Sequence, residues 1–197
     1  MFNEKYFFDS VREPFFKGSM NQEQVNNILI IKEIFNKISP DPDVRQLAYI
    51  YATIFHETAG TFRPIAEYGK GAGKDYGKKL KMGGGPGKRV PYSHPNHIYY
   101  GRGFEQLTWY ENYEAMGKSL NLPLLENPDL MLTVPVAAHS IITGMTKGMY
   151  TGKKLSTYIS RTGTDYYNAR RIINGIDKAA LIAGYAVKFY NALTEKV

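Results

Sequence analysis

The chain has no cysteine and one tryptophan among its 197 residues. Without cysteine, no disulfide can support the fold, and no thiolate can bind a metal or attack a substrate. No run of about 18 or more apolar residues occurs, so the sequence predicts no transmembrane span and no stable membrane insertion. In the first stretch, "MFNEKYFFDSVREPFF", Glu4, Lys5 and Asp9 interrupt the apolar residues. We therefore expect no signal peptide and a protein made in the cytoplasm.

Acidic residues are the scarcer charge. There are 18 Asp and Glu against 25 Lys and Arg, which gives a net charge of +7 and a pI of about 9.3. Such a surface attracts polyanions, whether nucleic acid, anionic lipid or an acidic cell-wall polymer, and charge alone does not choose among them. With 43% hydrophobic positions, the chain can bury a full core and is short enough to form one domain over residues 1–197.

Apolar residues recur at helical spacing in most of the chain. The pattern predicts a helical region over residues 1–40, with a helix between Asn21 and Ser39, and a second helix from an N-cap at Asp41 to Gly60. Later segments with the same spacing are 104–120, 134–149, 164–175 and 177–196, the last with Asp177 as N-cap. The fold class we expect is mainly α.

Residues 69–103 differ from the rest of the chain. They are rich in glycine and lysine, contain "MGGGPGK", and show little apolar periodicity. This composition predicts a basic insertion, either a long mobile loop or a small hairpin.

Two glutamates in "IFHETAGTFRPIAEYG" are candidates for acid–base chemistry. Glu57 lies in the last turn of the second predicted helix, where the carbonyl ends disfavour another negative charge and Phe55 and Phe62 could desolvate it. Glu67 follows a glycine and a proline that break the helix, on a loop where solvent and Lys70 would keep it ionised. A proton donor and a base need such different environments, so we assign Glu57 as the acid and Glu67 as the base.

The spacing of the two glutamates also suits one reaction class. Carboxylates three or four residues apart on a helix approach to about 5–6 Å at Cβ, whereas an inverting glycosidase needs roughly 6.5–9.5 Å to admit a water. Ten residues with a turn between them allow that gap. The alternative is that both are solvated surface residues, as most glutamates in a charged protein are.

A metal site is the other reading of this segment. His56 and Glu57 begin the H-E-x-x-H pattern of zinc enzymes, but Gly60 stands where the second histidine should be. His94 and His97 lie on the glycine-rich segment with no third ligand near in sequence. We expect no metal and no other cofactor.

Four stretches in order, "ATIFHETAGTF", "PIAEYG", "YYGRGFEQLTWYENY" and "NARRIINGIDKAALIAGY", resemble the family 19 glycoside hydrolases. They are most similar to the cysteine-free, phage-type endolysins of that superfamily. The resemblance covers roughly residues 47–193. It implies a lysozyme-like, two-lobed helical fold that cleaves β-1,4-linked N-acetylated aminosugar chains with inversion.

The resemblance also implies roles for individual residues. Glu57 matches the general acid, Glu67 the general base, and Thr108 the hydroxyl residue that holds the attacking water. The residues that match substrate-binding positions are His56, Gln106, Asn112 and Asn174. Plant members of the family carry disulfides and an arginine near the C-terminus that corresponds to Ile182 here.

Our leading hypothesis is a muramidase-type endolysin, a monomer that stays in the host cytoplasm until lysis and then cuts bacterial peptidoglycan. We expect the basic segment, with Lys78, Lys79 and Lys81, to concentrate it on the anionic wall. One alternative is a chitinase that acts on N-acetylglucosamine polymers. Another is a non-catalytic module that binds cell wall or nucleic acid. Nucleic acid is disfavoured, because the basic segment has few aromatic residues besides Tyr76 and Tyr92.

Overall fold

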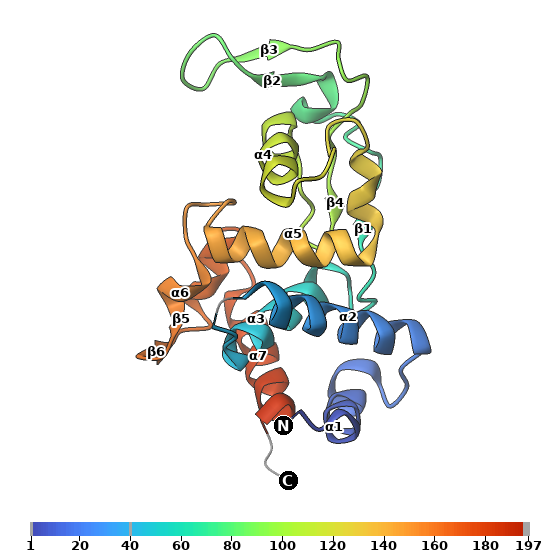
Figure 1. Cartoon of the computed structure of the whole chain (residues 1–197), viewed down its shortest axis with the longest axis vertical. Helices are drawn as coiled ribbons and strands as arrows, with labels where there is room; N and C mark the ends of the chain where they lie inside the picture. Colours follow the sequence, from blue (N-terminus) through green and yellow to red (C-terminus); the bar gives the residue numbers. More distant parts are fainter. Residues whose placement is uncertain (1, 40, 195–197) are drawn as a thin grey trace. The chain divides into compact units, whose positions relative to one another are not determined.

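The computed structural model describes residues 2–39 and 41–194, and the chain forms two compact units (Figure 1). The first unit comprises the described residues up to Phe62 and from Ile141 onward, and the second is Arg63–Ser140. The mainly α fold class is confirmed, since seven α-helices and only short strands occur in the described part. The prediction of one domain over the whole chain stays a prediction, and residues 1, 40 and 195–197 lie outside the described residues.

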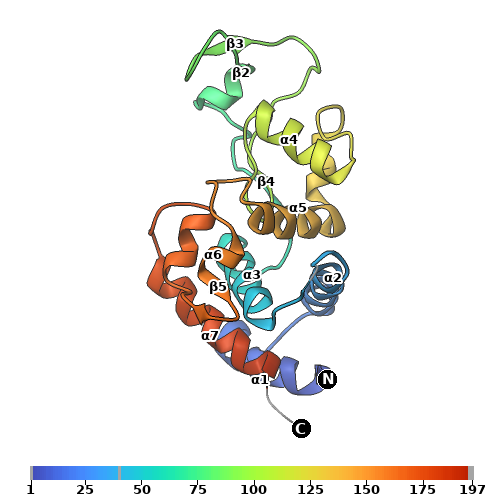
Figure 2. The ribbon, with the colours of Figure 1, turned by 60° about the vertical axis from the view of Figure 1, so that its left-hand side comes forward.

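The first unit is helical apart from one short strand pair. Helices α3 and α7 lie side by side, and α1 packs against α7 (Figures 1 and 2). The helices are α1 (Glu4–Phe16), α2 (Gln22–Ile38), α3 (Val44–Glu57), α6 (Leu155–Tyr158) and α7 (Ala179–Thr194). The remaining elements are the antiparallel strands β5 (Ile159–Ser160) and β6 (Gly163–Thr164) and the 3₁₀ helix η3 (Asn168–Ile172). The chain passes from one unit to the other within α5 (Val134–Lys147).

Helix α3 carries Glu57 as its last residue, and both of its ends differ from the sequence prediction. Asp43, not Asp41, is the N-cap, and its carboxylate accepts the Arg45 N–H at 2.9 Å. A residue before proline favours extended backbone, so Asp41 stays outside the helix and pairs instead with Arg161. The helix also ends before the predicted Gly60.

An aromatic core fixes the segment that follows Glu57. The rings of Phe15 and Phe189 stack at 4.1 Å, and Phe55 and Phe62 join the same cluster. From α2, the Asn27 amide donates to the Phe62 carbonyl at 2.9 Å. Because Phe62 is fully buried, the turn from α3 to the second unit has a defined path.

The second unit is built on paired short strands and one longer helix. Its core contains fully buried Tyr99, Phe104 and Tyr113. Buried Arg102 donates to Asp129 at 2.7 Å and to the Ile98 carbonyl at 3.1 Å. The strands are β1 (Ile65–Ala66), β2 (Leu80–Met82), β3 (Arg89–Pro91) and β4 (Arg102–Gly103). The helices are α4 (Tyr110–Leu120) and the 3₁₀ helices η1 (Asp75–Lys78) and η2 (Pro128–Leu132).

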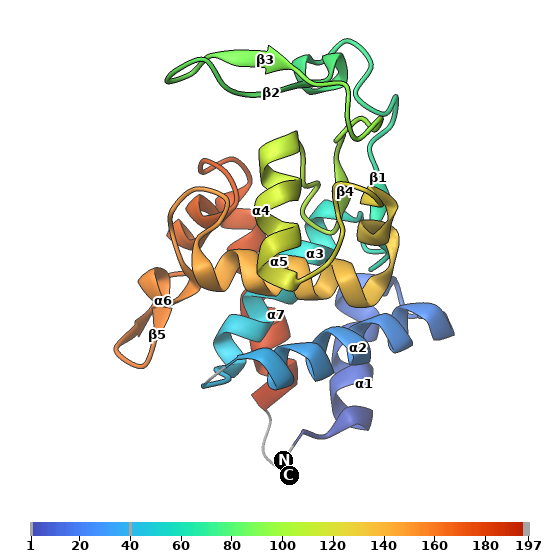
Figure 3. The same cartoon turned by 45° about the horizontal axis from the view of Figure 1, so that its top comes forward.

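The glycine-rich segment 69–103 contains a pair of short strands. Strands β2 and β3 form an antiparallel hairpin in which Lys81 faces Val90 (Figure 3). The small hairpin is therefore the correct one of the two structures predicted for residues 69–103. Strand β1 pairs with β4, with Ile65 opposite Gly103. This pairing places the residue after β1, Glu67, beside the residue before β4, Gly101.

Three helix predictions were wrong in detail. The segment 104–120 becomes helical only at Tyr110, because Trp109 has a φ of 75° and Gln106 a φ of 56°. The segment 164–175 begins in β6 and forms the short η3 in place of an α-helix. Helix α7 begins at Ala179, two residues beyond Asp177, and the predicted end of that helix at 196 lies outside the described residues.

Within residues 2–39 and 41–194, no helix is long and apolar enough to cross a membrane. Over the same residues, no group of three or more acidic, histidine or cysteine side chains is placed to hold a metal ion.

Candidate active site

Glu57 is held by an arginine of its own unit. Its side chain is 22% exposed, and Oε1 accepts a hydrogen bond of 2.8 Å from Nη1 of Arg170. Arg170, on η3, is 5% exposed, and its Nε donates to the Asp177 carbonyl at 3.2 Å. Two fixed contacts orient the guanidinium, so the carboxylate has a rigid, charged partner.

This partner was missed at the sequence level. The case for Glu57 as the acid considered the helix end, which is confirmed, and burial against Phe55 and Phe62, which instead belong to the aromatic core. Ile182, the position of the arginine in plant members, is fully buried in α7. The guanidinium that contacts Glu57 comes from Arg170, 113 residues further along the chain.

His56 and Asn174 lie in the first unit. His56 is half-buried on the last turn of α3, and its carbonyl accepts the N–H groups of Thr58 and Ala59. Asn174 is exposed, and its backbone N–H donates to the Arg170 carbonyl at 3.0 Å. Asn174 therefore belongs to the same turn as the arginine that holds Glu57. The substrate-binding role of both residues stays a prediction.

Glu67 is held by uncharged donors. The Tyr76 hydroxyl donates to its Oε1 at 2.6 Å, and the Gly101 N–H donates to its Oε2 at 3.1 Å. Its own N–H donates to the Gly101 carbonyl at 2.7 Å. Lys70 donates its backbone N–H to the Glu67 carbonyl at 3.1 Å, and the expected effect of its ammonium group on Glu67 stays a prediction. The proposed base is thus fixed at both oxygens by directional hydrogen bonds.

Tyr76 keeps its proton over a wide pH range. Burial raises the pKa of Tyr76 to about 12, and the hydrogen bond and negative charge of Glu67 act in the same direction. At neutral pH the phenol is therefore protonated and can donate to Glu67.

Gly101 is a glycine for steric reasons. A Cβ atom there would lie 2.8 Å from Oε1 of Gln106 and 3.3 Å from Cβ of Glu67. Gln106, for which we predicted a sugar contact, donates its amide to the carbonyls of Ile65 at 2.9 Å and Gly103 at 3.3 Å. It ties β1 to β4, and its contact with substrate stays a prediction.

Thr108 and Asn112 lie at the start of α4. Thr108 is half-buried, and its carbonyl accepts the Asn112 amide at 2.8 Å. Among the described residues, the Thr108 hydroxyl has no hydrogen-bond partner. That hydroxyl is free to bind water, as the predicted role requires, and the exposed Asn112 keeps its amide oxygen available.

The lysines predicted to attract the wall have structural partners. Lys78 pairs with Asp75 at 2.6 Å, Lys79 donates to Asn96, and the Lys81 ammonium lies 5.0 Å from the centroid of the Tyr110 ring.

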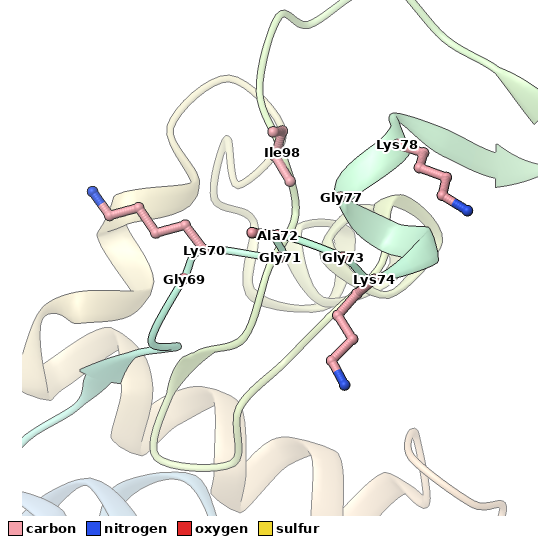
Figure 4. A pocket seen from close by; sticks show the side chains of 9 residues that line it. All are labelled: Gly69, Lys70, Gly71, Ala72, Gly73, Lys74, Gly77, Lys78 and Ile98. Carbon is pink, nitrogen blue, oxygen red and sulfur yellow. The ribbon is translucent and has the colours of Figure 1, made fainter.

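Two other lysines, Lys70 and Lys74, line a hollow of about 330 Å³ together with Lys78 and the glycine-rich backbone. Figure 4 shows their side chains pointing away from each other. Their ammonium groups therefore do not converge on one small anion.

The functional contacts missed from the sequence are Arg170, Tyr76 and Gly101. Arg170 stands in "NARRIING" next to a second, exposed arginine. The only feature of the sequence that pointed to Arg170 was its position shortly before Asn174, a predicted substrate-binding residue. Tyr76 follows Glu67 by nine residues, a spacing that no helix or strand period explains.

Comparisons with known proteins identify the family of the chain. The profile of glycoside hydrolase family 19, described as chitinase class I, matches residues 38–155, which include Glu57, Glu67 and Thr108. Basic endochitinase CHB4 of Brassica napus is 33% identical over 138 residues, covering 65% of this chain and 48% of that protein. Inactive chitinase-like protein 1 of Hevea brasiliensis is 37% identical over 97 residues, covering 47% of this chain and 30% of that protein. The chain thus spans less than half the length of either relative.

A crystal structure of a bacterial family 19 chitinase shares the fold. It aligns with a TM-score of 0.68 and 22% identity, over 98% of this chain and 95% of that one. This likeness confirms the lysozyme-like, mainly α fold expected from the sequence. Because the family profile covers more than half of the residues, the chain belongs to glycoside hydrolase family 19, the family of class I chitinases.

Proposed function

We propose that this chain is a glycosidase that cleaves β-1,4 bonds between N-acetylated aminosugars with inversion. Glu57 is the general acid and Glu67 the general base. The observation that carries the proposal is the fixation of Glu67 at both oxygens by Tyr76 and Gly101. A base must be aimed at its water, and directional donors achieve this aim without occupying every lone pair.

The reaction follows from these roles. Glu57 gives its proton to the glycosidic oxygen as the bond from that oxygen to the anomeric carbon breaks. A water held by the Thr108 hydroxyl attacks the anomeric carbon and loses its proton to Glu67. Proton donation leaves Glu57 negatively charged, and Arg170, whose Nη1 lies 2.8 Å from Oε1, stabilises that product state.

We propose bacterial peptidoglycan as the substrate, in the role of a monomeric endolysin released from the host cytoplasm at lysis. The support is the net charge of +7 and the outward-pointing Lys70 and Lys74. The glycan strands of the wall carry carboxylates on their peptides, whereas chitin is uncharged. A basic surface therefore favours the wall polymer through long-range attraction.

Chitin is the second candidate, because the relatives with curated names include endochitinases. A non-catalytic wall-binding module is the third, because one relative is named an inactive chitinase-like protein. One experiment, product analysis, tests both candidates.

Product analysis tests all three. Purified sacculi and chitin oligosaccharides are digested with the wild type and with Glu57→Gln, and the new reducing ends are identified by reduction and mass. Reducing N-acetylmuramic acid ends that only the wild type releases would establish a muramidase. Faster turnover of chitin oligosaccharides than of sacculi would establish a chitinase. Absence of any new reducing end from a folded wild type would leave the binding module.

The anomeric form of the first product tests inversion. Proton NMR of a fresh digest is expected to show the α-anomer before mutarotation. An initial β-anomer would contradict the inverting mechanism.

A further inference from the structure

A cation–aromatic contact links the hairpin to the start of α4. Arg89, the first residue of β3, places its Cζ 3.2 Å from the centroid of the Trp109 ring. Its Nη2 also pairs with Oε1 of Glu111 at 3.0 Å. Both side chains of the ion pair are largely buried, with 25% and 29% of their surface exposed.

The same indole contacts the tyrosine that holds Glu67. The rings of Trp109 and Tyr76 meet edge to face, with centroids 5.6 Å apart and an interplanar angle of 78°. Tyr76 then donates its hydroxyl to Glu67 at 2.6 Å. The contacts thus run without a break from Arg89 through two aromatic rings to the carboxylate.

From this chain of contacts we infer that the hairpin positions the base, and that Arg89 is a positioning residue that acts on Glu67 through Trp109 and Tyr76. The inference rests on the proposed function, because it takes Glu67 as the base. It gives the insertion 69–103 a role at the site that does not depend on its net charge.

The arrangement around Trp109 explains why Arg89 can act at a distance. The indole has the guanidinium over its face and the Tyr76 ring near it, an arrangement that suits the negative face and positive edge of an aromatic ring. Trp109 itself has a φ of 75°, and its N–H donates to the Tyr99 carbonyl at 2.9 Å. The Trp109 backbone is therefore fixed, and removal of Arg89 would allow only the indole ring to move.

The ion pair has little other support. Nη1 of Arg89 and Oε2 of Glu111 are buried and have no hydrogen-bond partner in the described part of the chain. The Arg89 guanidinium thus contacts one Glu111 oxygen and the Trp109 ring. We therefore expect removal of Arg89 to change the position of the Trp109 ring first.

The test is a double-mutant cycle between Arg89→Met and Tyr76→Phe. Lys81→Met is the matched control. Lys81 lies on the paired strand β2, so its replacement also removes one charge from the hairpin, but the ammonium of Lys81 lies over the Tyr110 ring. Activity is measured on a short uncharged aminosugar oligosaccharide, which excludes electrostatic attraction to the substrate. Each variant is followed as kcat and KM separately, because a positioning role changes kcat and leaves KM nearly constant.

We expect Tyr76→Phe to lower kcat about tenfold with little change in KM, because the carboxylate loses the hydroxyl that orients it. Arg89→Met should act in the same direction by about threefold. The double variant should match Tyr76→Phe alone, since both changes break one path. Losses that multiply in the double variant, or an equal effect of Lys81→Met, would overturn the inference.

Trp109 gives a second readout that needs no activity. It is the only tryptophan in the chain, so fluorescence and acrylamide quenching report its surroundings alone. Arg89→Met and the milder Arg89→Lys should both shift the emission, whereas Lys81→Met should not. An unchanged emission in folded Arg89→Met would refute the contact.

Glu67→Gln separates the two levels of argument. If it leaves activity intact, the proposed function fails. If it abolishes activity while Arg89→Met changes nothing, only the positioning role fails.

Discussion

Glu57 and Glu67 are ten residues apart in the sequence, yet opposite kinds of partner hold them. Glu57 faces a buried guanidinium, whose attraction depends mainly on distance. Glu67 faces a phenol and a backbone N–H, whose hydrogen bonds depend on angle. The first carboxylate is thus stabilised by charge and the second by geometry. A proton donor must bear the charge that donation leaves, and a base must be aimed, so the two environments suit two different roles.

The sharpest way to break this comparison is to remove each carboxyl in turn. We expect Glu57→Gln and Glu67→Gln each to lose about 10²–10⁴-fold in rate on a natural glycan. On an oligosaccharide with a nitrophenolate leaving group, Glu57→Gln should recover much of its rate, because that group leaves without a proton. Glu67→Gln should recover none. Initial rates of circular-dichroism-matched proteins decide the outcome, and the reverse pattern would exchange the two roles.

Removal of Arg170 tests the charged half of the comparison. Arg170→Leu should lower the free energy of unfolding by about 3 kcal/mol, because it leaves the partly buried Glu57 carboxylate without its partner. In a Glu57→Gln background the same change should cost much less. Urea denaturation of the four proteins measures the difference. An equal loss in both backgrounds would mean that Arg170 acts through packing and its bond to Asp177.

The two environments also differ in how far the sequence predicts them. Local periodicity predicted the helix between Asn21 and Ser39, which is observed as α2, because its apolar positions repeat within a few residues. The same periodicity predicted α3 but carried it on to Gly60, beyond its end at Glu57. The Glu57–Arg170 pair joins residues 113 apart, and no local pattern records which of two adjacent arginines turns inward.

Tertiary contacts account for the other misses. Apolar spacing extended the fourth helix back to residue 104, but Trp109 takes a positive φ and its N–H bonds to Tyr99. Glycine content predicted a hairpin or loop, but it did not show that Tyr76 would turn back onto Glu67. The glutamates were found from residue type, helix breakers and family resemblance, whereas their partners depend on the folded chain.

Substitution of lysines in the glycine-rich segment tests whether their charges attract the wall or support the fold. Replacing Lys70 and Lys74 by glutamine should weaken binding to sacculi at low salt and flatten its salt dependence, because the screening length falls from about 10 Å at 0.1 M to about 3 Å at 1 M. The matched pair Lys78 and Lys79, which have partners in the fold, should have a smaller effect. Co-sedimentation across a salt series measures both. Equal effects would show that only net charge matters.

The smallest expected effect concerns pH, and it sharpens the contrast between a phenol and a guanidinium. The pKa of Tyr76 is raised from 10.0 to about 12. A group whose pKa is raised by folding stabilises the protein fully below its unfolded pKa and loses that contribution as the pH passes its folded pKa. The excess stability of the wild type over Tyr76→Phe should therefore persist up to about pH 10 and shrink between there and about pH 12. Guanidinium groups do not lose their proton in proteins, so the excess over Arg170→Leu should change less across the same window. Urea denaturation at stepped pH measures both differences, with Tyr68→Phe as the control, since Tyr68 is fully exposed. A Tyr76 difference that grew with pH would mean that the phenol does not donate to Glu67 in solution.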